Sequence, residues 1–383
     1  MRFLFSTRPF YGHFHVMAAV AQAAQADGHD VAFATAAPFV GVVERSGFTF
    51  FPAGLDPSDP TWTDQNRADD RDWGVRVTRS KVTDLLGLLD TWRPDVIVRE
   101  QTDFAGLLAA EAAGLPAATL GPAMFIPSRS WNRLMGGGLD RLRNELGIQP
   151  DPDWERTHAY LYLDPVPPWY QLPSASTIAV RHMVRPGLFD GGHLSDPPRW
   201  LASLPDRPTV YLTLGTVFNR RADVRERILG AIGALPVNVL CTLGPEQEAR
   251  AIRESIPNNV RLEAFIPQSQ LLPYCDLVIS HGGFSTVMGA LAHGLPSLVV
   301  PLGSDNLVHA RRCVTLGLGL SLAPAELRNE DVRSAVWKLL TEPRWRSEAR
   351  RRRADIDSLP SPSSAVDLLV RLALCRAPIG TDQ

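Results

Sequence analysis

The sequence of 383 residues predicts an α/β fold with two doubly wound parallel sheets, and three observations lead to this prediction. Short apolar runs alternate with helical segments along most of the chain, as expected for successive βαβ units. Several helical segments end at a glycine, such as Gly28, Gly47 and Gly114, the residue type that most readily closes a helix. The alternation stops around residues 181–207, which are rich in proline and glycine and indicate a connection between two halves.

The first half is expected to contain five strands separated by helices. The predicted strands span residues 2–6, 30–35, 48–52, 95–100 and 117–121, and the helices between them span 13–27, 38–46, 80–92 and 102–113. Doubly wound sheets usually place such strands in the order 3-2-1-4-5, which brings the ends of strands 1 and 4 to one crevice. Two segments show no regular period: a polar stretch that contains Trp62 and Trp73, and residues 121–173. Long connections of this kind are commonly functional.

The second half repeats the pattern without repeating the sequence. Its predicted strands span 209–214, 238–243, 260–264, 276–280, 297–301 and 319–322, followed by a basic helix at 344–357 and a last amphipathic helix at 363–375. We therefore expect a first Rossmann-like domain at 1–185, a linker at 186–207 and a second Rossmann-like domain at 208–345. The C-terminal helices occupy 346–383.

Composition excludes several classes of protein. Hydrophobic residues make up 45% and charged residues 21% of the chain, as in globular proteins. The net charge of −2 argues against a nucleic-acid partner. The four cysteines have no C-x-x-C spacing, and no apolar run has the length of a membrane span. We expect a cytoplasmic protein without an integral membrane segment, and the sequence leaves a homodimer open.

The stretch "SHGGFSTVMGALAHGLPSLVVP" at residues 280–301 contains a candidate anion site. An apolar strand leads into Gly282 and Gly283, and a helix is predicted to begin near Phe284. Glycines let an anion approach the unpaired N–H groups and the positive end of a helix dipole, and Ser285 and Thr286 add hydroxyl donors. Taken alone, two glycines before a helix also fit an ordinary tight turn.

Two longer segments carry a family resemblance. Residues 264–319, "AFIPQSQLLPYCDLVISHGGFSTVMGALAHGLPSLVVPLGSDNLVHARRCVTLGLG", resemble the donor-binding signature of the family 1 GT-B glycosyltransferases. Residues 11–35, "YGHFHVMAAVAQAAQADGHDVAFAT", resemble the N-terminal motif of that family. The resemblance implies a GT-B fold, in which two Rossmann-like doubly wound parallel-sheet domains face each other across a cleft. It implies that the domain at 1–185 binds the acceptor, that the domain at 208–345 binds the nucleotide sugar, and that the last helix packs back on the N-terminal domain. It also implies an inverting, bacterial natural-product glycosyltransferase, a hexosyl or deoxyhexosyl transferase.

The resemblance assigns donor-binding residues by position. The base would lie against Phe265, Ile266, Pro267 and Gln268. The diphosphate would be held by His281, Gly282, Gly283, Ser285 and Thr286, and by a turn formed by Thr213, Gly215 and Thr216. Asp305 and Asn306 stand where an Asp-Gln or Glu-Gln pair binds the hydroxyls of the sugar, although the same two residues would also suit the N-cap of a helix.

Two departures bear on the donor. The family often has a glutamate at the position of Gly289, where its carboxylate holds both ribose hydroxyls of a UDP-sugar. Deoxyribose lacks one of these hydroxyls, so Gly289 favours a dTDP-linked deoxysugar; close helix packing would explain this glycine equally well. Asn306 is shorter than the usual glutamine, and His309 replaces a common asparagine. UDP-glucose therefore stays open as an alternative donor.

His13 and Glu100 are the candidate catalytic pair. They lie at the ends of predicted strands 1 and 4, which are neighbours in the expected order. A histidine takes up a proton near neutral pH, and a carboxylate behind it would fix its tautomer. The resemblance assigns the general base to His13 and places an aspartate at the position of Glu100. Because this chain has the longer acid there, Asp103 is an alternative orienting residue.

The transfer is expected to need no metal ion or other cofactor. Two D-x-D patterns occur, at residues 151–153 and 355–357, but neither follows a strand as a metal-binding pair would. Aromatic and apolar residues in irregular segments favour an apolar acceptor such as a polyketide, although each of them would also fit a local core. They are Met124, Phe125, Ile126, Trp131, Trp154, Trp169 and Tyr170.

Three other functions are compatible with Rossmann-like halves. An NAD-dependent oxidoreductase would carry G-x-G-x-x-G after the first strand, where this chain has "STRPFYGHF". A UDP-sugar epimerase would need carboxylates around the sugar, and the Gly12-His13 motif argues against it. A non-catalytic sugar-nucleotide-binding helper protein would not need His13.

Overall fold

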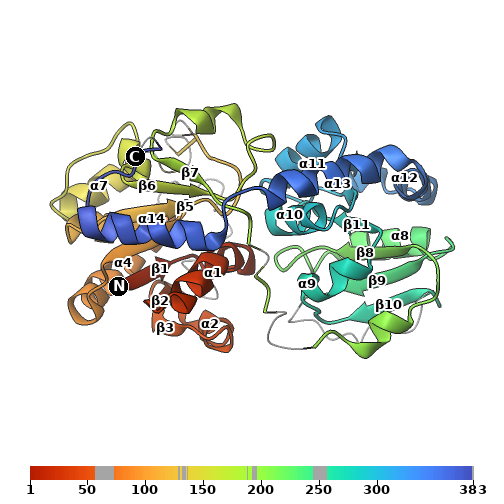
Figure 1. Cartoon of the computed structure of the whole chain (residues 1–383), viewed down its shortest axis with the longest axis horizontal. Helices are drawn as coiled ribbons and strands as arrows, with labels where there is room; N and C mark the ends of the chain where they lie inside the picture. The colour runs from red at the N-terminus through yellow and green to blue at the C-terminus, as the bar shows by residue number, and fades with distance from the viewer. Residues whose placement is uncertain are drawn as a thin grey trace. The chain divides into compact units, whose positions relative to one another are not determined.

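The computed structural model describes residues 1–56, 73–127, 130–131, 135, 137–187, 189–191, 196–244 and 257–381. The chain forms two compact units (Figure 1). The first contains Met1–Gly187 and Leu359–Gln383, and the second contains Leu188–Ser358. The segment around Trp62, predicted as a polar connection, lies outside the described residues.

The first unit is built on a seven-stranded parallel sheet in the order β3-β2-β1-β4-β5-β6-β7. Its strands are β1 (Arg2–Ser6), β2 (Asp30–Thr35), β3 (Thr49–Pro52), β4 (Val96–Glu100), β5 (Ala117–Leu120), β6 (Leu161–Asp164) and β7 (Arg181–Met183). The five predicted strands and their order are confirmed. The sheet continues through β6 and β7, which lie in segments that were predicted to contain no strand. Both are short and follow proline-rich or loop-like stretches, so they lack the clear pattern of the other strands.

Helices cover both faces of this sheet. Those of the first unit are α1 (Tyr11–Ala26), α2 (Val40–Arg45), α4 (Trp73–Trp92), α5 (Phe104–Ala112), α7 (Gly138–Glu145) and α14 (Pro362–Cys375). α1 begins two residues before the predicted helix, which places His13 in its first turn. α7 lies within the segment 121–173, where no regular element was predicted. The last helix, α14, packs against α1.

The second unit is built on a six-stranded parallel sheet in the order β10-β9-β8-β11-β12-β13. Its strands are β8 (Thr209–Thr213), β9 (Asn238–Thr242), β10 (Val260–Glu263), β11 (Leu277–Ser280), β12 (Ser297–Val299) and β13 (Gly319–Ser321). All six predicted strands are confirmed. The helices are α8 (Ala222–Ile232), α9 (Gln268–Leu271), α10 (Phe284–Ala292), α11 (Asn306–Thr315), α12 (Asn329–Thr341) and α13 (Pro343–Asp357).

The second unit extends beyond the boundaries expected from the sequence. Within the expected linker 186–207, Leu201 is buried in the same core cluster as Tyr211 and Leu240. The Arg261 guanidinium lies 3.8 Å from the ring centre of Trp200. At the other end, α13 belongs to the second unit and α14 to the first, so the expected block 346–383 is divided.

Burial follows the layered architecture. The strands next to β1 and β8 consist almost entirely of buried residues, as expected when helices cover both faces of a parallel sheet. The carboxyl ends of the strands are therefore the places where loops can present polar groups. None of the helices in the described part of the chain has the length and apolar character that a bilayer crossing needs.

Candidate active site

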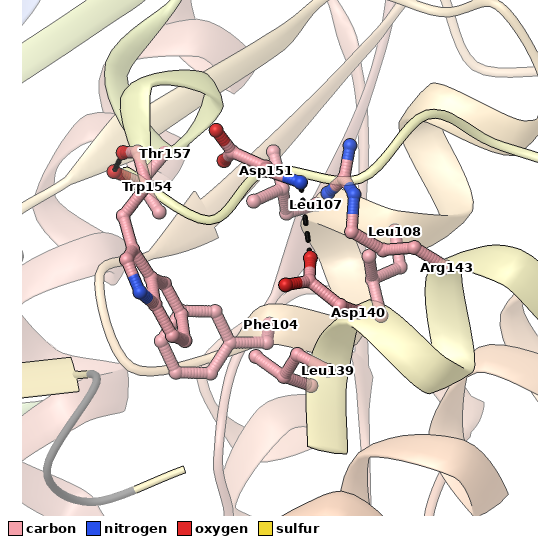
Figure 2. A pocket seen from close by; sticks show the side chains of 9 residues that line it. All are labelled: Phe104, Leu107, Leu108, Leu139, Asp140, Arg143, Asp151, Trp154 and Thr157. Atoms are coloured by element: carbon pink, nitrogen blue, oxygen red, sulfur yellow. Dashed lines mark hydrogen bonds between the residues drawn. The ribbon is translucent and has the colours of Figure 1, made fainter. Parts of the chain in front are cut away.

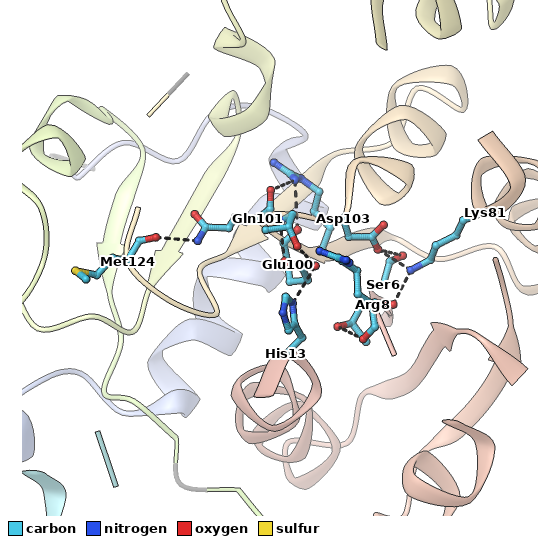
Figure 3. Close-up of polar contacts among 11 residues, drawn as sticks. Ser6, Arg8, His13, Lys81, Glu100, Gln101, Asp103 and Met124 are labelled. Atoms are coloured by element: carbon cyan, nitrogen blue, oxygen red, sulfur yellow. Dashed lines mark hydrogen bonds and ion pairs between the residues drawn. The ribbon is translucent and has the colours of Figure 1, made fainter. Parts of the chain in front are cut away.

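A histidine and a glutamate meet at the carboxyl edge of the first sheet. His13 lies in the first turn of α1, shortly after β1, and Glu100 is the last residue of β4. β1 and β4 are parallel neighbours, so the segments that follow them emerge at the same edge. Nδ1 of His13 lies 3.2 Å from Oε1 of Glu100 (Figure 3). The contact is a short ion-pair distance, because among the described residues this nitrogen has no partner with hydrogen-bond geometry.

The glutamate is held in its ionised form. Its side chain is fully buried, whereas 26% of the His13 side chain is exposed and can meet a ligand. The backbone N–H and the hydroxyl of Thr102 both donate to the carboxylate, at 2.6 and 2.5 Å. Burial raises the pKa of Glu100, but the charge and hydrogen bond of His13 oppose this. With smaller contributions from Arg8 and Thr102, they lower the pKa to about 2.

Asp103, the alternative orienting residue, is engaged elsewhere. Its Oδ2 accepts a hydrogen bond from Oγ of Ser6 at 2.6 Å and another from Nζ of Lys81 at 2.7 Å. Figure 3 shows these contacts on the side of Glu100 away from Met124. The described geometry therefore pairs His13 with Glu100 rather than with Asp103.

A buried cation lies directly behind the pair. Arg99 is fully buried, and its guanidinium donates to the backbone oxygens of Glu100, Gln101 and Thr157 at 3.3, 3.1 and 2.7 Å. Burial lowers the pKa of Arg99 to about 10, although the charges of Glu100 and Asp103 act in the opposite direction. Arg99 therefore keeps its charge at neutral pH and helps to balance the two carboxylates.

In the second unit, the turn formed by Gly282 and Gly283 lies against the ring of His281. Gly282 has a φ of 90°, and Gly283 occupies the N-cap position of α10 without a side-chain cap. A Cβ on Gly283 would lie 2.5 Å from Nε2 of His281, and a Cβ on Gly215 would lie 2.4 Å from Cε1 of the same ring. Both glycines are therefore needed for the ring to occupy this position.

This second histidine is neutral at cellular pH. Only 9% of His281 is exposed, and its Nδ1 has no hydrogen-bond partner among the described residues. Burial lowers the pKa of His281 to about 4; the Asp305 charge raises it and His309 lowers it. A neutral imidazole beside the uncapped start of α10 can donate a hydrogen bond to an anion.

The predicted hydroxyl turn lies at the end of β8. Gly215 has a φ of 71°, and its N–H donates to Oγ1 of Thr213 at 3.2 Å. Thr216 is half-buried in the following loop, and Thr213 is buried. Because β8 and β11 are parallel neighbours, this turn and the glycine turn share one edge of the sheet. A side chain on Gly215 would overlap the ring of His281, so the two turns are in direct contact at this ring.

The segment 265–268, which was predicted to bind the nucleotide base, presents one exposed ring. Phe265 is 43% exposed, whereas Ile266 is buried in the core beneath it. Pro267 is the N-cap residue of α9, and Gln268 begins that helix. Nε2 of Gln268 donates to Oγ1 of Thr286 at 3.2 Å. This hydrogen bond links the segment predicted to bind the nucleotide base to the predicted diphosphate site. Ser285 is half-buried beside Thr286.

Asp305 and Asn306, which were predicted to bind the hydroxyls of the sugar, lie in two different environments. Asp305 stands at the N-cap position of α11, as the alternative interpretation expected, but its side chain makes no capping hydrogen bond. Its Oδ2 lies 3.2 Å from Nε2 of the fully buried His309. Asn306 is 2% exposed, and its Oδ1 accepts a hydrogen bond from the N–H of Gly303 at 3.2 Å. Ser304, just before the pair, has a φ of 54°, a conformation that costs energy and is often found near functional sites.

Most of the aromatic residues predicted to face the acceptor lie in the core. Trp131 and Trp154 are each 6% exposed and pack edge-to-face on Phe104, with ring centres 4.9 and 5.3 Å away. Met124, Phe125 and Tyr170 are also buried, whereas Ile126 and Trp169 are half-buried. The local-core interpretation holds for the five buried residues, because loops over a sheet still need an apolar underside.

A small cavity in the first unit is not an acceptor site. It has a volume of about 20 Å³ and lies among α5, α7 and the segment 151–157 (Figure 2). That volume accommodates about one water molecule, far less than an aglycone. Asp151, from the first D-x-D pattern, lines this cavity, and its N–H donates to Oδ1 of Asp140 at 3.0 Å.

The described residues contain no cluster of three or more His, Cys, Asp or Glu side chains suited to a metal ion. The first carboxylate of each D-x-D pattern has other partners. Asp151 accepts hydrogen bonds from the backbone of Glu155 and Arg156, at 3.0 and 3.1 Å. Asp355 pairs with Arg352 at 3.1 Å, on the same charged helix.

Sequence reasoning missed two charged residues beside the pair, Lys81 and Arg99. Lys81 lies among the buried positions Thr78, Val82 and Leu85 of α4. A lysine in the apolar stripe of an amphipathic helix is a signal that could have revealed it. Arg99 is the only charge within an otherwise apolar run just before Glu100, and a charge inside a buried parallel strand is a comparable signal.

Comparisons with known proteins found similar sequences and structures over nearly the whole chain. A family described as "Erythromycin biosynthesis protein CIII-like, C-terminal domain" matches residues 226–372. The 4'-demethylrebeccamycin synthase of Lentzea aerocolonigenes is 30% identical, over 96% of this chain and 98% of that protein. The aclacinomycin-T 2-deoxy-L-fucose transferase of Streptomyces galilaeus is 27% identical, over 97% and 96%. The crystal structure of glycosyltransferase VinC in complex with dTDP has a TM-score of 0.79 and 25% identity, covering 98% of this chain and 100% of that chain.

Proposed function

The chain belongs to the family 1 natural-product glycosyltransferases, enzymes that transfer a sugar to a natural-product aglycone, and we propose that its donor is a dTDP-linked deoxysugar. The proposed acceptor is a hydroxyl of an apolar aglycone such as a polyketide, and the proposed transfer inverts the anomeric carbon. The observation that carries the catalytic part is the 3.2 Å contact between His13 and the buried Glu100.

In the proposed reaction His13 is the general base. Its Nδ1 lies against Glu100, which leaves Nε2 to accept the proton of the acceptor hydroxyl. The ionised Glu100 orients the ring and stabilises the imidazolium, as a buried carboxylate does for the histidine of a serine hydrolase. The acceptor oxygen then bonds to the anomeric carbon, while the bond from that carbon to the diphosphate oxygen breaks.

The leaving dTDP is proposed to be stabilised by the start of α10. Negative charge grows on the diphosphate as the bond breaks, and preorganised donors lower the energy of that charge. The candidates are the uncapped N–H groups that follow Gly283, the neutral ring of His281 and the hydroxyls of Ser285 and Thr286. Because these groups supply the charge stabilisation, the proposed mechanism uses no metal ion.

Gly289 supports the choice of dTDP over UDP. It is buried in α10, at the position where the family often has a glutamate that holds both ribose hydroxyls. A glycine there removes a contact that only a ribose could use. The 2-deoxy-L-fucose transferase and the structure in complex with dTDP, both similar to this chain, point in the same direction.

A thermal-shift panel with dTDP, UDP and GDP tests the donor. A ligand that binds only the folded state raises the unfolding temperature, and we expect the largest shift with dTDP. Incubation with dTDP-deoxysugars and a panel of apolar polyketides should then give a product heavier by one sugar, measured by mass spectrometry. A larger shift with UDP would contradict the proposed donor.

Two variants separate donor binding from chemistry. His13→Ala should keep the thermal shift with dTDP but form product about 10³-fold more slowly. Gly289→Glu should move the nucleotide preference towards UDP, because the added carboxylate can hold two ribose hydroxyls. An unchanged preference would remove Gly289 from the argument without affecting the assignment of His13.

A further inference from the structure

We propose that Lys81, a buried lysine of α4, is a positioning residue for the general base. The proposal rests on the proposed function, because it assumes that His13 takes the proton. Lys81 would not touch the substrate, since only 8% of its side chain is exposed. Its role would be to hold the two turns at which His13 and Glu100 meet.

Lys81 joins the turn after β1 to the turn after β4. Its Nζ donates to the backbone oxygen of Thr7 and to Oδ2 of Asp103, both at 2.7 Å. Thr7 starts the segment that leads to His13, and Asp103 lies three residues after Glu100. Ser6, the last residue of β1, donates to the same Oδ2 at 2.6 Å (Figure 3).

Both turns transmit this restraint over short distances. The N–H of Asp103 donates to the backbone oxygen of Glu100 at 3.0 Å, so these two residues form one tight turn. On the other side, the N–H of His13 donates to the backbone oxygen of Phe10 at 3.1 Å, at the start of α1. Thr7 is fully buried and donates to Ala34 of the neighbouring strand at 3.3 Å. A displaced Lys81 would therefore move both members of the pair.

Charge gives Lys81 a second influence on the pair. Two buried cations, Lys81 and Arg99, balance two buried carboxylates, Glu100 and Asp103. Buried charges are costly unless they are paired. Removing the ammonium group leaves Asp103 without its partner cation close to the pair, so the electrostatic environment of His13 changes together with its position.

Three variants test the proposal. Lys81→Met removes the charge and the donors but keeps an unbranched chain, and Lys81→Arg keeps both. Arg79→Met is the matched control: it lies on the same helix, is 49% exposed and pairs with Glu145. The first measurement needs no substrate. It is the ring nitrogen NMR signature of His13, assigned by its absence in His13→Ala. We expect a changed tautomer signature in Lys81→Met only.

The second measurement is the kinetics of transfer from a dTDP-sugar. A misplaced catalytic group costs up to about 100-fold in rate, so we expect Lys81→Met to lower kcat by about 10- to 100-fold. The KM for the donor and the Kd of dTDP should stay within about twofold, because the donor residues lie in the second unit. Lys81→Arg should recover most of kcat, and Arg79→Met should match the wild type.

A purely structural role predicts a different result. If Lys81→Met lowers the unfolding temperature but leaves the His13 signature and the kcat per folded molecule unchanged, the proposal is wrong. If Lys81→Met does not fold, Asp103→Asn replaces it, because it keeps the shape and removes the charge that Lys81 pairs with. An unchanged His13 signature in folded Asp103→Asn would also refute the proposal. Absence of transfer with every acceptor would refute the proposed function, whereas the NMR result would still decide the role of Lys81.

Discussion

Two histidines, His13 and His281, follow strands of the two sheets, and their surroundings differ. His13 is partly exposed and lies beside a fully buried carboxylate. His281 is almost buried, is enclosed by two glycines and has no hydrogen-bonded carboxylate among the described residues. The first environment places an ionised carboxylate beside one ring nitrogen and leaves part of the ring open to a ligand. The second opposes a charge on the ring and lowers the pKa of His281 to about 4.

The comparison shows that the residue type and its place after a strand do not set its chemistry. Both rings start from the same intrinsic pKa and both lie at the carboxyl edge of a parallel sheet. The neighbouring groups decide whether the ring acts as a base or as a neutral hydrogen-bond donor. The predictions below test this contrast, from the largest expected effect to the smallest.

The largest effect is expected for His13→Ala. General base catalysis typically contributes 10²- to 10⁴-fold, so kcat should fall by about 10³-fold, measured as product formed per minute. The thermal shift with dTDP should be unchanged. His29→Ala, a histidine that follows α1 rather than a strand end, serves as the control and should keep full activity. Turnover close to the wild-type value in His13→Ala would remove this residue from the mechanism.

The stability of the protein should depend on pH in two separate windows. The pKa of His281 falls from 6.5 to about 4 on folding, so its contribution is present above pH 6.5 and is lost as the pH falls towards 4. The pKa of Glu100 falls from 4.5 to about 2, so its contribution is present above pH 4.5 and is lost towards pH 2. Each shift corresponds to about 3 kcal/mol at most.

Unfolding temperatures between pH 8 and pH 4 test the first window. His281→Asn cannot titrate and should lose less stability than the wild type between pH 6.5 and pH 4. His158→Asn is a parallel test in the first unit: burial and the charge of Arg99 lower the pKa of His158 to about 3, so this variant should also lose less stability than the wild type over that range. Parallel curves for the wild type and His281→Asn would show that burial of His281 does not penalise its charged form.

Glu100→Gln removes the charge that supports His13 and keeps the size of the side chain. We expect kcat to fall by about 10²-fold, because a neutral amide neither stabilises the imidazolium nor enforces one tautomer. Glu100→Asp restores the residue common in the family and keeps the charge, so its loss should be smaller. Equal rates for Glu100→Gln and the wild type would show that another group orients His13.

His281→Ala should mainly affect the donor. Loss of one hydrogen bond to a charged group costs about 1.5 to 3 kcal/mol, so the Kd of dTDP measured by calorimetry should rise at least about tenfold. His293→Ala is the control, because its ring lies at the other end of α10 and contacts the backbone oxygen of Gly289 at 2.9 Å. Unchanged dTDP binding in His281→Ala would contradict the proposed contrast.

Strong local patterns were sufficient to predict most of the fold. The apolar strands on either side of β1 and β8 were confirmed because each is a short buried run bounded by turn residues. β6 and β7 were missed because each is short and gains stability only by pairing with its neighbour. For Trp131 and Trp154 the sequence left both an acceptor-facing and a local-core position open, and the structure places both in the core with Phe104. A sequence shows that an aromatic residue lies in a loop, but it does not show what lies beneath that loop.

The sequence by itself determined the two series of βαβ units, the histidine after the first strand and the glycine turn before α10. These features depend on neighbours within a few residues, so local chemistry specifies them. Only the tertiary structure decided that Glu100 rather than Asp103 meets His13, that Lys81 pairs with Asp103, and that Gly215 lies against the ring of His281. Each of these contacts joins residues far apart in the chain, and their distances are fixed only when the sheets assemble and bury the charges.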